Sequence, residues 1–469
     1  MPELSLYIVT FNCARNPIQR SLFASHLFGA LPPDTSDNSS DNALPDILVL
    51  SLQEVAPLPC AFLGGRHLAP YLDNFHRAVQ LASAARRGDA GQGEHYSAVI
   101  SRNVGMTAVM VFARPECADA VRWIDVAGVG TGLWAMGNKG SVGVRLGLSS
   151  PIGQVRRRDD RNLVEMTFVA AHLEAFERGC QWRNENWESI ARRLVFMPAG
   201  GSLPGSPRSA REHSSSEVDG EEEEPLLPDA LDNEKAISHG IYRPTSHLFL
   251  AGDLNYRTNG YPPTPNAYQA YPQPIHDTAD PRHYTHLLQN DQLTRELRAG
   301  RTCHGLRELP IDFPPTYKYL NRAPQSLDDR QGVWNWAKHR WPSWCDRILF
   351  LDLPPWSSAG GGNLEFRGYT ALPVMPTSDH RPVALSLFVP LEPIPQPPED
   401  AVGGSDDPRL SPPFPLDPTW RDRRVWARRR EVVVGLVAYL AWTWEGNCVL
   451  LTLAVGCVGG WWIARGLST

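Results

Sequence analysis

Several apolar runs of this chain end at a polar residue whose side chain could take part in chemistry. The runs and the residues that follow them are "LYIVTF" before Asn12, "ILVLSLQ" before Glu54, "TFVAA" before His172, and "LFLAG" before Asp253, with Asn255 two positions further on. One polar residue after a strand is ordinary turn chemistry. Four such endings favour a shared rim, because ligands of open α/β sheets bind beyond the carboxyl ends of the strands.

These residue types permit metal-assisted hydrolysis of a phosphate ester. Mg²⁺ takes oxygen ligands, commonly one or two carboxylates besides waters and phosphate oxygens, and Glu54 is the best candidate ligand. Asp253 and Asn255 lie two residues apart on an extended segment and therefore point to the same side, where they could orient or deprotonate a water. His380, in "PTSDHRPV", could donate to a phosphoryl oxygen if a carboxylate keeps its imidazole protonated.

Other kinds of site are disfavoured by the spacing of the residues. The histidines and cysteines do not form a cluster with zinc-ligand spacing. The stretch "GVGTGLWAMGNKGS" is close to a phosphate-binding P-loop, but Asn138 separates the glycine from Lys139 and no GK[ST] follows. Ser51 and Ser378 lack the GxSxG context of a hydrolase nucleophile.

The apolar runs themselves predict buried strands, because they are short and rich in β-branched and aromatic residues. Amphipathic stretches such as 181–196 lie between several of them and predict helices. This alternation indicates an α/β sandwich whose strands are covered by helices. The predicted strands are residues 6–11, 47–50, 108–113, 141–146, 167–171, 248–251, 347–352 and 383–389.

Most of the negative charge belongs to one segment. The chain of 469 residues has a net charge of -6, and residues 199–240 alone carry ten acidic and three basic residues. That segment is rich in Ser, Gly and Pro and predicts a disordered insertion, since it has little apolar surface to bury. The basic "RRRDDR" at 156–161 predicts a shorter hairpin insertion. Eight cysteines without CxxC pairs favour a reduced, cytosol-facing protein, and the N-terminus does not resemble a cleaved signal peptide.

The C-terminal part of the chain differs from the rest. Residues 391–420 are proline-rich and predict a semi-extended linker, long enough for the preceding domain to reach a lipid head group. Apolar runs at 432–444 and 448–464 follow, and the second, of 17 residues, lies at the lower limit for crossing a bilayer. A single span after an interfacial helix and a shallow hairpin both fit. These runs are preceded by Arg423, Arg424, Arg428, Arg429 and Arg430. By the positive-inside rule, the arginines predict that the N-terminal side of the tail, with the linker and the folded domain, faces the cytosol.

Five sequence blocks resemble the signature blocks of the inositol polyphosphate 5-phosphatases, which belong to the endonuclease/exonuclease/phosphatase superfamily. They occur in that family's order and cover residues 1–390 apart from the insertion at 199–240, so a catalytic domain at 1–390, a linker at 391–420 and a membrane tail at 421–469 are expected. The blocks are "MGNKGSVGVRL" (136–146), "GDLNYR" (252–257), "FPPTYKY" (313–319), "KHRWPSWCDRIL" (338–349) and "SDHRPV" (378–383).

The resemblance implies a four-layer α/β sandwich and Mg²⁺-dependent removal of a 5-phosphate from phosphoinositides or soluble inositol phosphates. It assigns the metal to Glu54 with Asn12 beside it, the attacking water to Asp253 and Asn255, and the scissile phosphate to His172 and Asn255. It also makes His380 the transition-state stabiliser, oriented by Asp346, with Asp379 near the metal. The substrate contacts that it implies are Lys139, Tyr317, Lys318, Lys338 and Arg340, which would bracket the neighbouring 4-phosphate.

The catalytic domain with a hydrophobic tail resembles tail-anchored fungal members of that family. This resemblance implies phosphatidylinositol 4,5-bisphosphate as substrate, an endoplasmic reticulum membrane as location and a role in phosphoinositide signalling and membrane traffic, with neither a nucleic acid nor an obligate protein partner. Two alternatives remain: another phosphodiesterase of the superfamily, such as a nuclease or sphingomyelinase, and an inactive tether that only binds phosphoinositide. The blocks "PTYKY" and "KHR" disfavour the first, and the intact polar residues of the rim disfavour the second.

Overall fold

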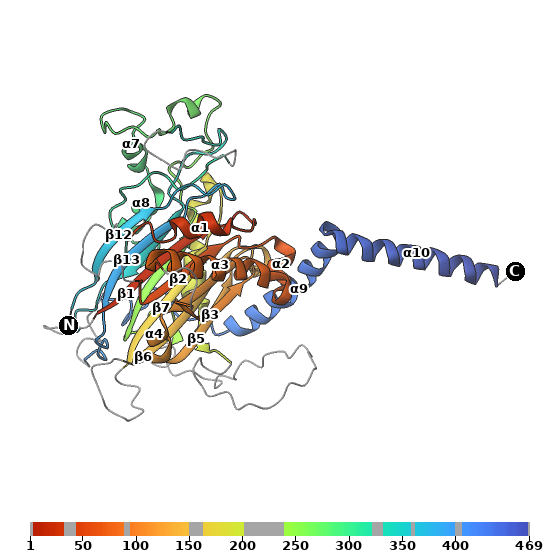
Figure 1. Cartoon of the computed structure of the whole chain (residues 1–469), viewed down its shortest axis with the longest axis horizontal. Coiled ribbons are helices and arrows are strands. Elements are labelled where there is room, and N and C mark those ends of the chain that lie inside the picture. The colour runs from red at the N-terminus through yellow and green to blue at the C-terminus, as the bar shows by residue number, and fades with distance from the viewer. Residues whose placement is uncertain are drawn as a thin grey trace.

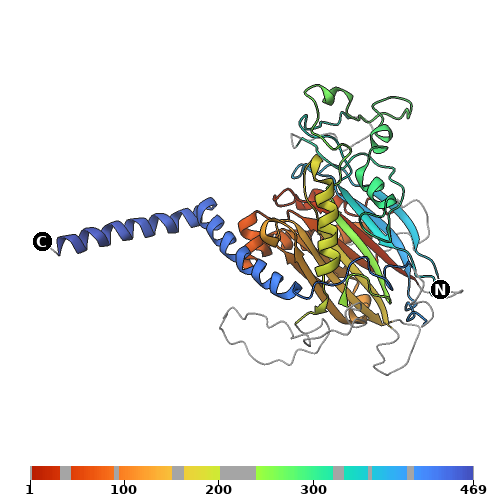
Figure 2. The ribbon, with the colours of Figure 1, turned by 180° about the vertical axis from the view of Figure 1, so that it is seen from behind.

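Two β-sheets packed face to face form the body of the molecule, and helices cover their outer faces (Figures 1 and 2). The computed structural model describes residues 3–31, 44–88, 94–149, 163–200, 239–320, 332–357, 362–398 and 406–467. The helices of the body are α1 (Arg20–His26), α2 (Leu58–Leu63), α3 (Gly65–Arg87), α4 (Pro115–Ala120), α5 (Cys180–Arg193), α7 (Tyr284–Leu288) and α8 (Gln292–Arg298), with 3-10 turns η1 (Leu133–Ala135), η3 (Glu177–Gly179) and η4 (Ala267–Ala270).

The first sheet has six strands in the order β12-β13-β1-β2-β4-β3. Its neighbours β1 and β2 are parallel, and the other pairs are antiparallel. Parallel pairing makes β1 and β2 end at the same edge of the sheet. The strands are β1 (Glu3–Asn12), β2 (Ile47–Gln53), β3 (Ser97–Val104), β4 (Thr107–Ala113), β12 (Glu365–Ala371) and β13 (Val383–Pro390).

The second sheet has seven strands in the order β10-β11-β9-β7-β6-β5-β8. Strands β7 and β9 are parallel and the other pairs antiparallel, so β7 and β9 also end at one edge. The strands are β5 (Val121–Gly130), β6 (Gly140–Ser149), β7 (Leu163–His172), β8 (Met197–Pro198), β9 (Ser246–Asp253), β10 (Leu306–Arg307) and β11 (Asp346–Leu351).

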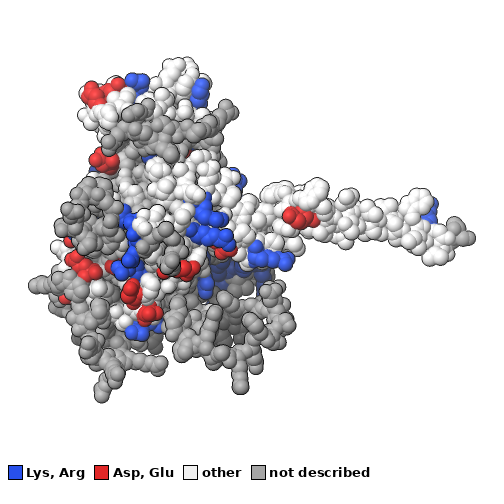
Figure 3. All heavy atoms as spheres, viewed as in Figure 1, with Lys and Arg blue, Asp and Glu red and all other residues white. Residues whose placement is uncertain are grey.

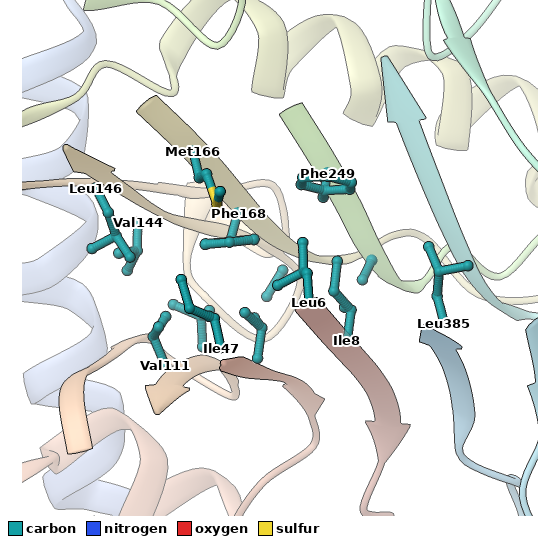
Figure 4. Packing of buried hydrophobic residues seen from close by; sticks show 14 of the residues in the cluster. Leu6, Ile8, Ile47, Val111, Val144, Leu146, Met166, Phe168, Phe249 and Leu385 are labelled. Carbon is teal, nitrogen blue, oxygen red and sulfur yellow. The ribbon is translucent and has the colours of Figure 1, made fainter. Parts of the chain in front are cut away.

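The largest core lies between the two sheets (Figure 4). Leu6 and Ile8 of β1 point into it and meet side chains such as Phe168 of β7 and Phe249 of β9. The residue between them, Tyr7, faces the opposite side, as the two-residue period of a strand requires. Strands buried on both faces read as continuous apolar runs. This burial explains why the strands are conspicuous in the sequence.

Helices close the two outer faces. Phe75 and Val79 of α3 pack with β2 of the first sheet, whereas Trp187 and Ile190 of α5 pack with β7 and β9 of the second. The order helix, sheet, sheet, helix confirms the predicted four-layer α/β sandwich, and every predicted strand is present. The eight cysteines are free thiols. The predicted insertion at 156–161 and nearly all of 199–240 lie outside the described residues.

Two long helices form the C-terminal tail (Figure 1). Helix α9 (Trp420–Trp442) lies against α2, β5 and η1, whereas α10 (Trp444–Gly466) projects away from the body. Among the described helices, α10 alone is long and apolar enough to cross a membrane, and none of its apolar window is buried. Figure 3 shows Lys and Arg side chains gathered where the tail leaves the body, and an almost uncharged surface beyond.

The linker predicted at 391–420 is not a free spacer over its later part. Arg409 is buried, the ring of Phe414 lies 5.3 Å from that of His304, and the amide of Asp417 donates to the carbonyl of Arg192 at 2.8 Å. These contacts fasten residues 406–419 to the second sheet and α5. Residues 406–419 therefore lie against the body and do not form an extended spacer as the sequence predicts for this part of the linker.

Candidate functional site

The register of the second sheet brings four predicted site residues to one edge. Gly140 of β6 stands opposite His172 of β7, His172 opposite Asp253 of β9, and Asp253 opposite Asp346 of β11. Lys139 immediately precedes β6. Because neighbouring strands lie about 4.8 Å apart, residues at one level of four strands form a continuous row.

The first sheet contributes the other half of the site. Asn12 ends β1, and its side-chain amide donates to Oδ2 of Asp253 at 2.8 Å, which joins the two sheets. Glu54 follows the last residue of β2. The hydroxyl of Ser378 donates to the carbonyl of Asn12 at 2.6 Å and so holds the segment that carries His380 against the end of β1.

Asp253 is the centre of the buried network. Its Oδ2 lies 3.4 Å from Nε2 of His172 and 3.9 Å from Nε2 of His380. Its Oδ1 accepts from the backbone amide of Asn255 at 3.1 Å. All four residues are buried. The structure thus brings together the residues predicted to handle the water and the phosphate.

His380 is held from behind by a second carboxylate. Its Nδ1 lies 2.8 Å from Oδ2 of Asp346, and the hydroxyl of Thr316 donates to the same oxygen at 2.7 Å. The ring of Tyr317 packs against the imidazole with centroids 4.6 Å apart. A hydrogen bond at Nδ1 fixes which way the other ring nitrogen points, so Nε2 of His380 faces Asp253.

Burial opposes charge on both His380 and Asp253, but their neighbours overcome it. Burial would lower the pKa of His380, and the carboxylates Asp346 and Asp253 instead raise it to about 9. Burial would raise the pKa of Asp253, but the charge of His380 and the hydrogen bond with His172 lower it well below its usual range. At neutral pH the centre therefore contains an imidazolium beside a carboxylate.

His172 is neutral and in contact with Lys139. Burial, followed by the charge of Lys139, lowers the pKa of His172, and the Lys139 ammonium contacts Nε2 of the ring. One ring nitrogen cannot accept from Lys139 and also donate to Asp253. A phosphoryl oxygen at this point would accept from the ammonium and leave His172 free to donate.

Glu54 and Asn12 have the donor atoms that a hard divalent cation requires. The Glu54 side chain is 25% exposed, and its carboxylate pairs at 3.1 Å with Arg15, which is itself 62% exposed. Its charge also acts on Lys139 and His172, so it faces the site. Oδ1 of Asn12 accepts from the amide of Ala14 at 2.9 Å and keeps a second lone pair. These oxygen donors fit Mg²⁺.

A second group of candidate ligands fits a metal less well. Among the described residues, Asp253, Asp346 and His380 bring ligand-type atoms within 4.8 Å of one another. His380, however, uses Nδ1 for Asp346 and is held protonated at neutral pH. A histidine must be deprotonated to ligate a metal. The geometry of this group suits proton placement instead.

Lys318 lies on the rim of the network. Its ammonium pairs with the carboxylate of Asp379, for which the resemblance implies a place near the metal. Burial would lower the pKa of Lys318, but Tyr317 and Asp379 raise it above its usual value. Asp379 therefore neutralises a predicted substrate cation in this structure.

Arg340 and Lys338 lie further out. The Arg340 guanidinium is 3.6 Å from a carboxylate oxygen of buried Glu177, and its charge acts on Lys318, so these two cations share the rim. Lys338 is exposed, and its ammonium lies 4.1 Å over the ring of Tyr268. The structure thus brings Lys318 and Arg340 toward one another and leaves Lys338 at the periphery.

Arg257 and Asn255 hold the loop after β9. Nε of Arg257 donates to the carbonyl of Asn255 at 3.0 Å, and its guanidinium contacts the Asn255 side-chain oxygen. The Asn255 amide group donates to the carbonyl of Leu173 at 3.1 Å. The guanidinium of Arg257 also lies 4.3 Å over the ring of Tyr317. Arg257 therefore stabilises the loop, and Asn255 is directed by protein partners.

Sequence reasoning missed two supporting hydroxyls, those of Thr316 and Ser378. Each stands within a quoted block, "FPPTYKY" or "SDHRPV". Their position in those blocks was the available signal, but a hydroxyl residue in a loop is too common to be singled out by type.

The fold and this arrangement place the chain in a known class. The model of the Endonuclease/Exonuclease/phosphatase family 2 matches residues 9–386, and the chain belongs to this family. Among curated proteins, it is 30% identical over 313 residues to a type II inositol polyphosphate 5-phosphatase 15 of Arabidopsis thaliana, covering 62% of this chain and 24% of that protein. It is 28% identical over 360 residues to a type IV inositol polyphosphate 5-phosphatase 9 of the same plant, covering 72% and 68%.

A solved structure shares the fold. It is the inositol polyphosphate 5-phosphatase domain of a synaptojanin, in complex with inositol (1,4)-bisphosphate and calcium ion, at 20% identity with a TM-score of 0.53 over 92% of each chain. The chain matches only about a quarter or less of the length of the first curated relatives.

Proposed function

We propose that this protein is a divalent-metal-dependent phosphatase that removes the 5-phosphate of phosphatidylinositol 4,5-bisphosphate and leaves phosphatidylinositol 4-phosphate. The observation that carries the proposal is the buried centre, where the Asp253 carboxylate and the His380 imidazolium face each other at 3.9 Å. A phosphoryl group bound there meets an anion that can orient a water and a cation that can donate a hydrogen bond. The names of the two plant relatives, both inositol polyphosphate 5-phosphatases, support it.

Each residue of the centre has one task in this reaction. Asp253 accepts a hydrogen bond from the attacking water and directs its lone pair at phosphorus; its low pKa makes it a weak base, which favours orientation over deprotonation. His380 donates from Nε2 to a phosphoryl oxygen as negative charge develops, and Asp346 keeps it protonated. The bond between phosphorus and the inositol oxygen breaks as the new bond to water forms; the water loses a proton to solvent and the leaving oxygen takes one up, which gives the inositol hydroxyl and inorganic phosphate.

Glu54, with the side-chain oxygen of Asn12, is our proposed Mg²⁺ site. A cation held there would supply positive charge to the phosphoryl oxygens. The synaptojanin domain of similar fold contains a calcium ion beside its inositol bisphosphate, which supports a divalent cation in this role.

Cations around the centre suit a substrate with more than one phosphate. Lys139 reaches the centre itself, whereas Lys318 and Arg340 share the rim. Fixed ammonium and guanidinium groups bind phosphate oxygens strongly. We propose that Lys139, which the resemblance assigns to the neighbouring 4-phosphate, instead contacts the scissile phosphate because it lies at His172. Lys318, Arg340 and Tyr317 face the 4-phosphate, with Lys338 contributing from outside.

The tail and the surface beside it suit a membrane. The 23 residues of α10, at about 1.5 Å each, would extend about 35 Å, enough for a hydrocarbon core of about 30 Å. Leu133 and Trp134, 64% and 61% exposed, lie beside α9, whose outward face includes Val433 and Val437. Exposed apolar residues of this kind suit the lipid interface. We propose an endoplasmic reticulum anchor with a cytosolic catalytic domain, and a single span, since α9 is docked on the body.

A substrate panel tests the activity. Full-length protein with Mg²⁺ is expected to release inorganic phosphate from 5-phosphorylated inositides and to leave sphingomyelin and DNA uncleaved, and chelation should remove the activity. Vesicles that contain phosphatidylinositol 4,5-bisphosphate, the corresponding soluble inositol phosphate, sphingomyelin and DNA would be compared. Phosphocholine from sphingomyelin, or nucleotides from DNA, would support the phosphodiesterase alternative, and inositide binding without cleavage of any substrate would support the inactive tether.

Alkaline carbonate extraction tests the anchor. Because α10 buries a continuous apolar surface only if it enters lipid, full-length protein is expected to stay in the membrane pellet. A variant with Leu453→Arg and Val455→Arg in the middle of α10, both exposed in this structure, is expected to move to the supernatant and to keep its activity on a soluble substrate. Wild-type protein in the supernatant would refute an integral anchor.

A further inference from the structure

The tail helix α9 carries a buried charge that the proposed reaction does not use. Glu431 is 0% exposed, although it lies in a segment where the sequence predicts a basic surface next to a membrane. Its carboxylate is 3.2 Å from a guanidinium nitrogen of Arg424 and 3.4 Å from one of Arg428. Burying a carboxylate is costly unless it is paired and hydrogen-bonded. The two arginines supply the pairing, and a contact outside helix α9 shows what the buried carboxylate does.

This contact is with the loop that carries Lys139. Oε1 of Glu431 accepts the backbone amide of Gly137 at 2.9 Å. Two residues later, the Lys139 ammonium contacts His172 at the centre. A carboxylate of the tail therefore holds the peptide group that precedes the lysine nearest to the scissile phosphate.

Backbone hydrogen bonds continue from Gly137 to the proposed metal site. The amide of Met106 donates to the carbonyl of Gly137 at 2.8 Å, and the amide of Val55 donates to the carbonyl of Met106 at 3.2 Å. Val55 directly follows Glu54. A Cβ on Gly105 would lie 2.3 Å from the Gly137 carbonyl oxygen, so these two segments fit too closely to shift independently.

Helix α9 is itself fixed to the body next to this loop. Arg428 donates to the carbonyl of Phe62 at 2.5 Å, at the end of α2, and Arg430 donates to the carbonyl of Trp134 at 3.3 Å. A Cβ on Gly435 would lie 2.9 Å from Cβ of Phe62, so the helix approaches α2 closely. The helix that precedes the membrane anchor thus contacts both α2 and the loop of Lys139.

We propose that Glu431 is a positioning residue: through Gly137 it holds Lys139 in place, so the tail is part of the catalytic unit as well as its anchor. This inference rests on the proposed function, in which Lys139 binds the scissile phosphate of the substrate. Because Lys139 binds phosphate before the reaction, loosening its loop raises KM more than it lowers kcat.

The test uses full-length protein in detergent with a soluble inositol phosphate that carries 4- and 5-phosphates, so membrane orientation has no effect. Glu431→Ala removes a charge-assisted hydrogen bond and is expected to raise KM about tenfold, with kcat changed less than about threefold. Glu431→Gln can still accept from Gly137 and is expected to restore KM to within about threefold. The matched control is Glu445→Gln, an exposed glutamate at the start of α10, with unchanged KM.

A double-mutant cycle separates positioning from general destabilisation. In a Lys139→Ala background, Glu431→Ala is expected to raise KM by less than about twofold, because the residue through which it acts is absent. An undiminished effect there, or an unchanged KM in the single variant, would overturn the proposal. If Glu431→Ala does not fold, Arg428→Gln replaces it, with a smaller rise in KM that also disappears without Lys139.

Hydrogen exchange provides a readout that needs no activity. Glu431→Ala is expected to speed amide exchange in the segment 132–139 while leaving β7 and β9 protected. Unchanged exchange at 132–139 would overturn the positioning role even if KM rises. If wild-type protein releases no 5-phosphate, the proposed function fails, and the exchange experiment still decides whether Glu431 holds this loop.

Discussion

Replacing Asp253 by Asn is expected to lower kcat by roughly 10²–10⁴-fold, the usual contribution of a residue that handles the reacting proton or water. Asn keeps the size of the side chain, but Asn12 and the amide of Asn255 donate to different oxygens of Asp253, so the single oxygen of Asn keeps only one of these two contacts. The substitution also removes the anion, and the NH₂ group of Asn cannot accept a hydrogen bond from the attacking water. The measurement is single-turnover phosphate release at saturating substrate, with circular dichroism to verify the fold.

The matched control is Asp291→Asn, which makes the same change at another buried site. Asp291 pairs with Arg347 at 3.0 Å and caps α8 through the amide of Thr294. The Asp291→Asn substitution is expected to lower the melting temperature, because it removes one charge of a buried ion pair. It is expected to leave kcat of the folded enzyme within about twofold of wild type. Equal loss of kcat in the two variants, or full activity in Asp253→Asn, would contradict the role given to Asp253.

Replacing His380 by Gln is expected to lower kcat by a similar factor of roughly 10²–10⁴. The imidazolium is the buried donor that faces Asp253, and Gln can supply a hydrogen bond but no charge. In wild-type enzyme, kcat/KM should fall above pH 9, because His380 with a pKa of about 9 loses its proton there. The variant should lack this alkaline limb, and a pH profile from 6 to 10.5 measures it.

Asp346→Asn tests what keeps His380 protonated. Burial lowers the pKa of His380 and the carboxylate of Asp346 is the largest influence that raises it, so the alkaline limb should move to lower pH in this variant. An unchanged limb would mean that another group titrates. Asn can still accept a hydrogen bond from Nδ1, which separates the charge from the orientation of the ring.

The same shift affects stability. The pKa of His380 in the folded protein, about 9, is above its ordinary value of 6.5. Its contribution to the free energy of unfolding is therefore fully present below pH 6.5 and is lost as pH rises through 9. The difference in melting temperature between wild type and His380→Gln should shrink over that interval, which differential scanning calorimetry can follow.

The strands and the types of residue that end them were predictable from the sequence. A strand buried on both faces needs a continuous apolar run, which is a local property of the chain. Asn12, Glu54, His172 and Asp253 could be grouped because they follow such runs. The resemblance added Asp346 as the residue that orients His380, although nothing local indicates that Asp346 stands opposite Asp253 in the register.

The position of the tail could not be predicted in this way. Its apolar composition indicates a membrane segment, and its arginines indicate a cytosolic side, but both are properties of composition. Glu431 and Gly137 are 294 residues apart, and no periodicity or spacing reports a contact of that kind. The linker read as an extended spacer for the same reason: proline content describes local stiffness, whereas Arg409 and Asp417 are held by partners elsewhere in the chain.

The sequence by itself therefore determined the class of fold, the chemical types at the strand ends and the presence of an apolar tail, because each depends on neighbours within a few residues. Only the tertiary structure decided that Asp253 lies between two histidines, that Arg257 holds its loop, and that Glu431 reaches the loop of Lys139. These depend on strand order and helix docking. Both are set by burial of surfaces that are distant along the chain.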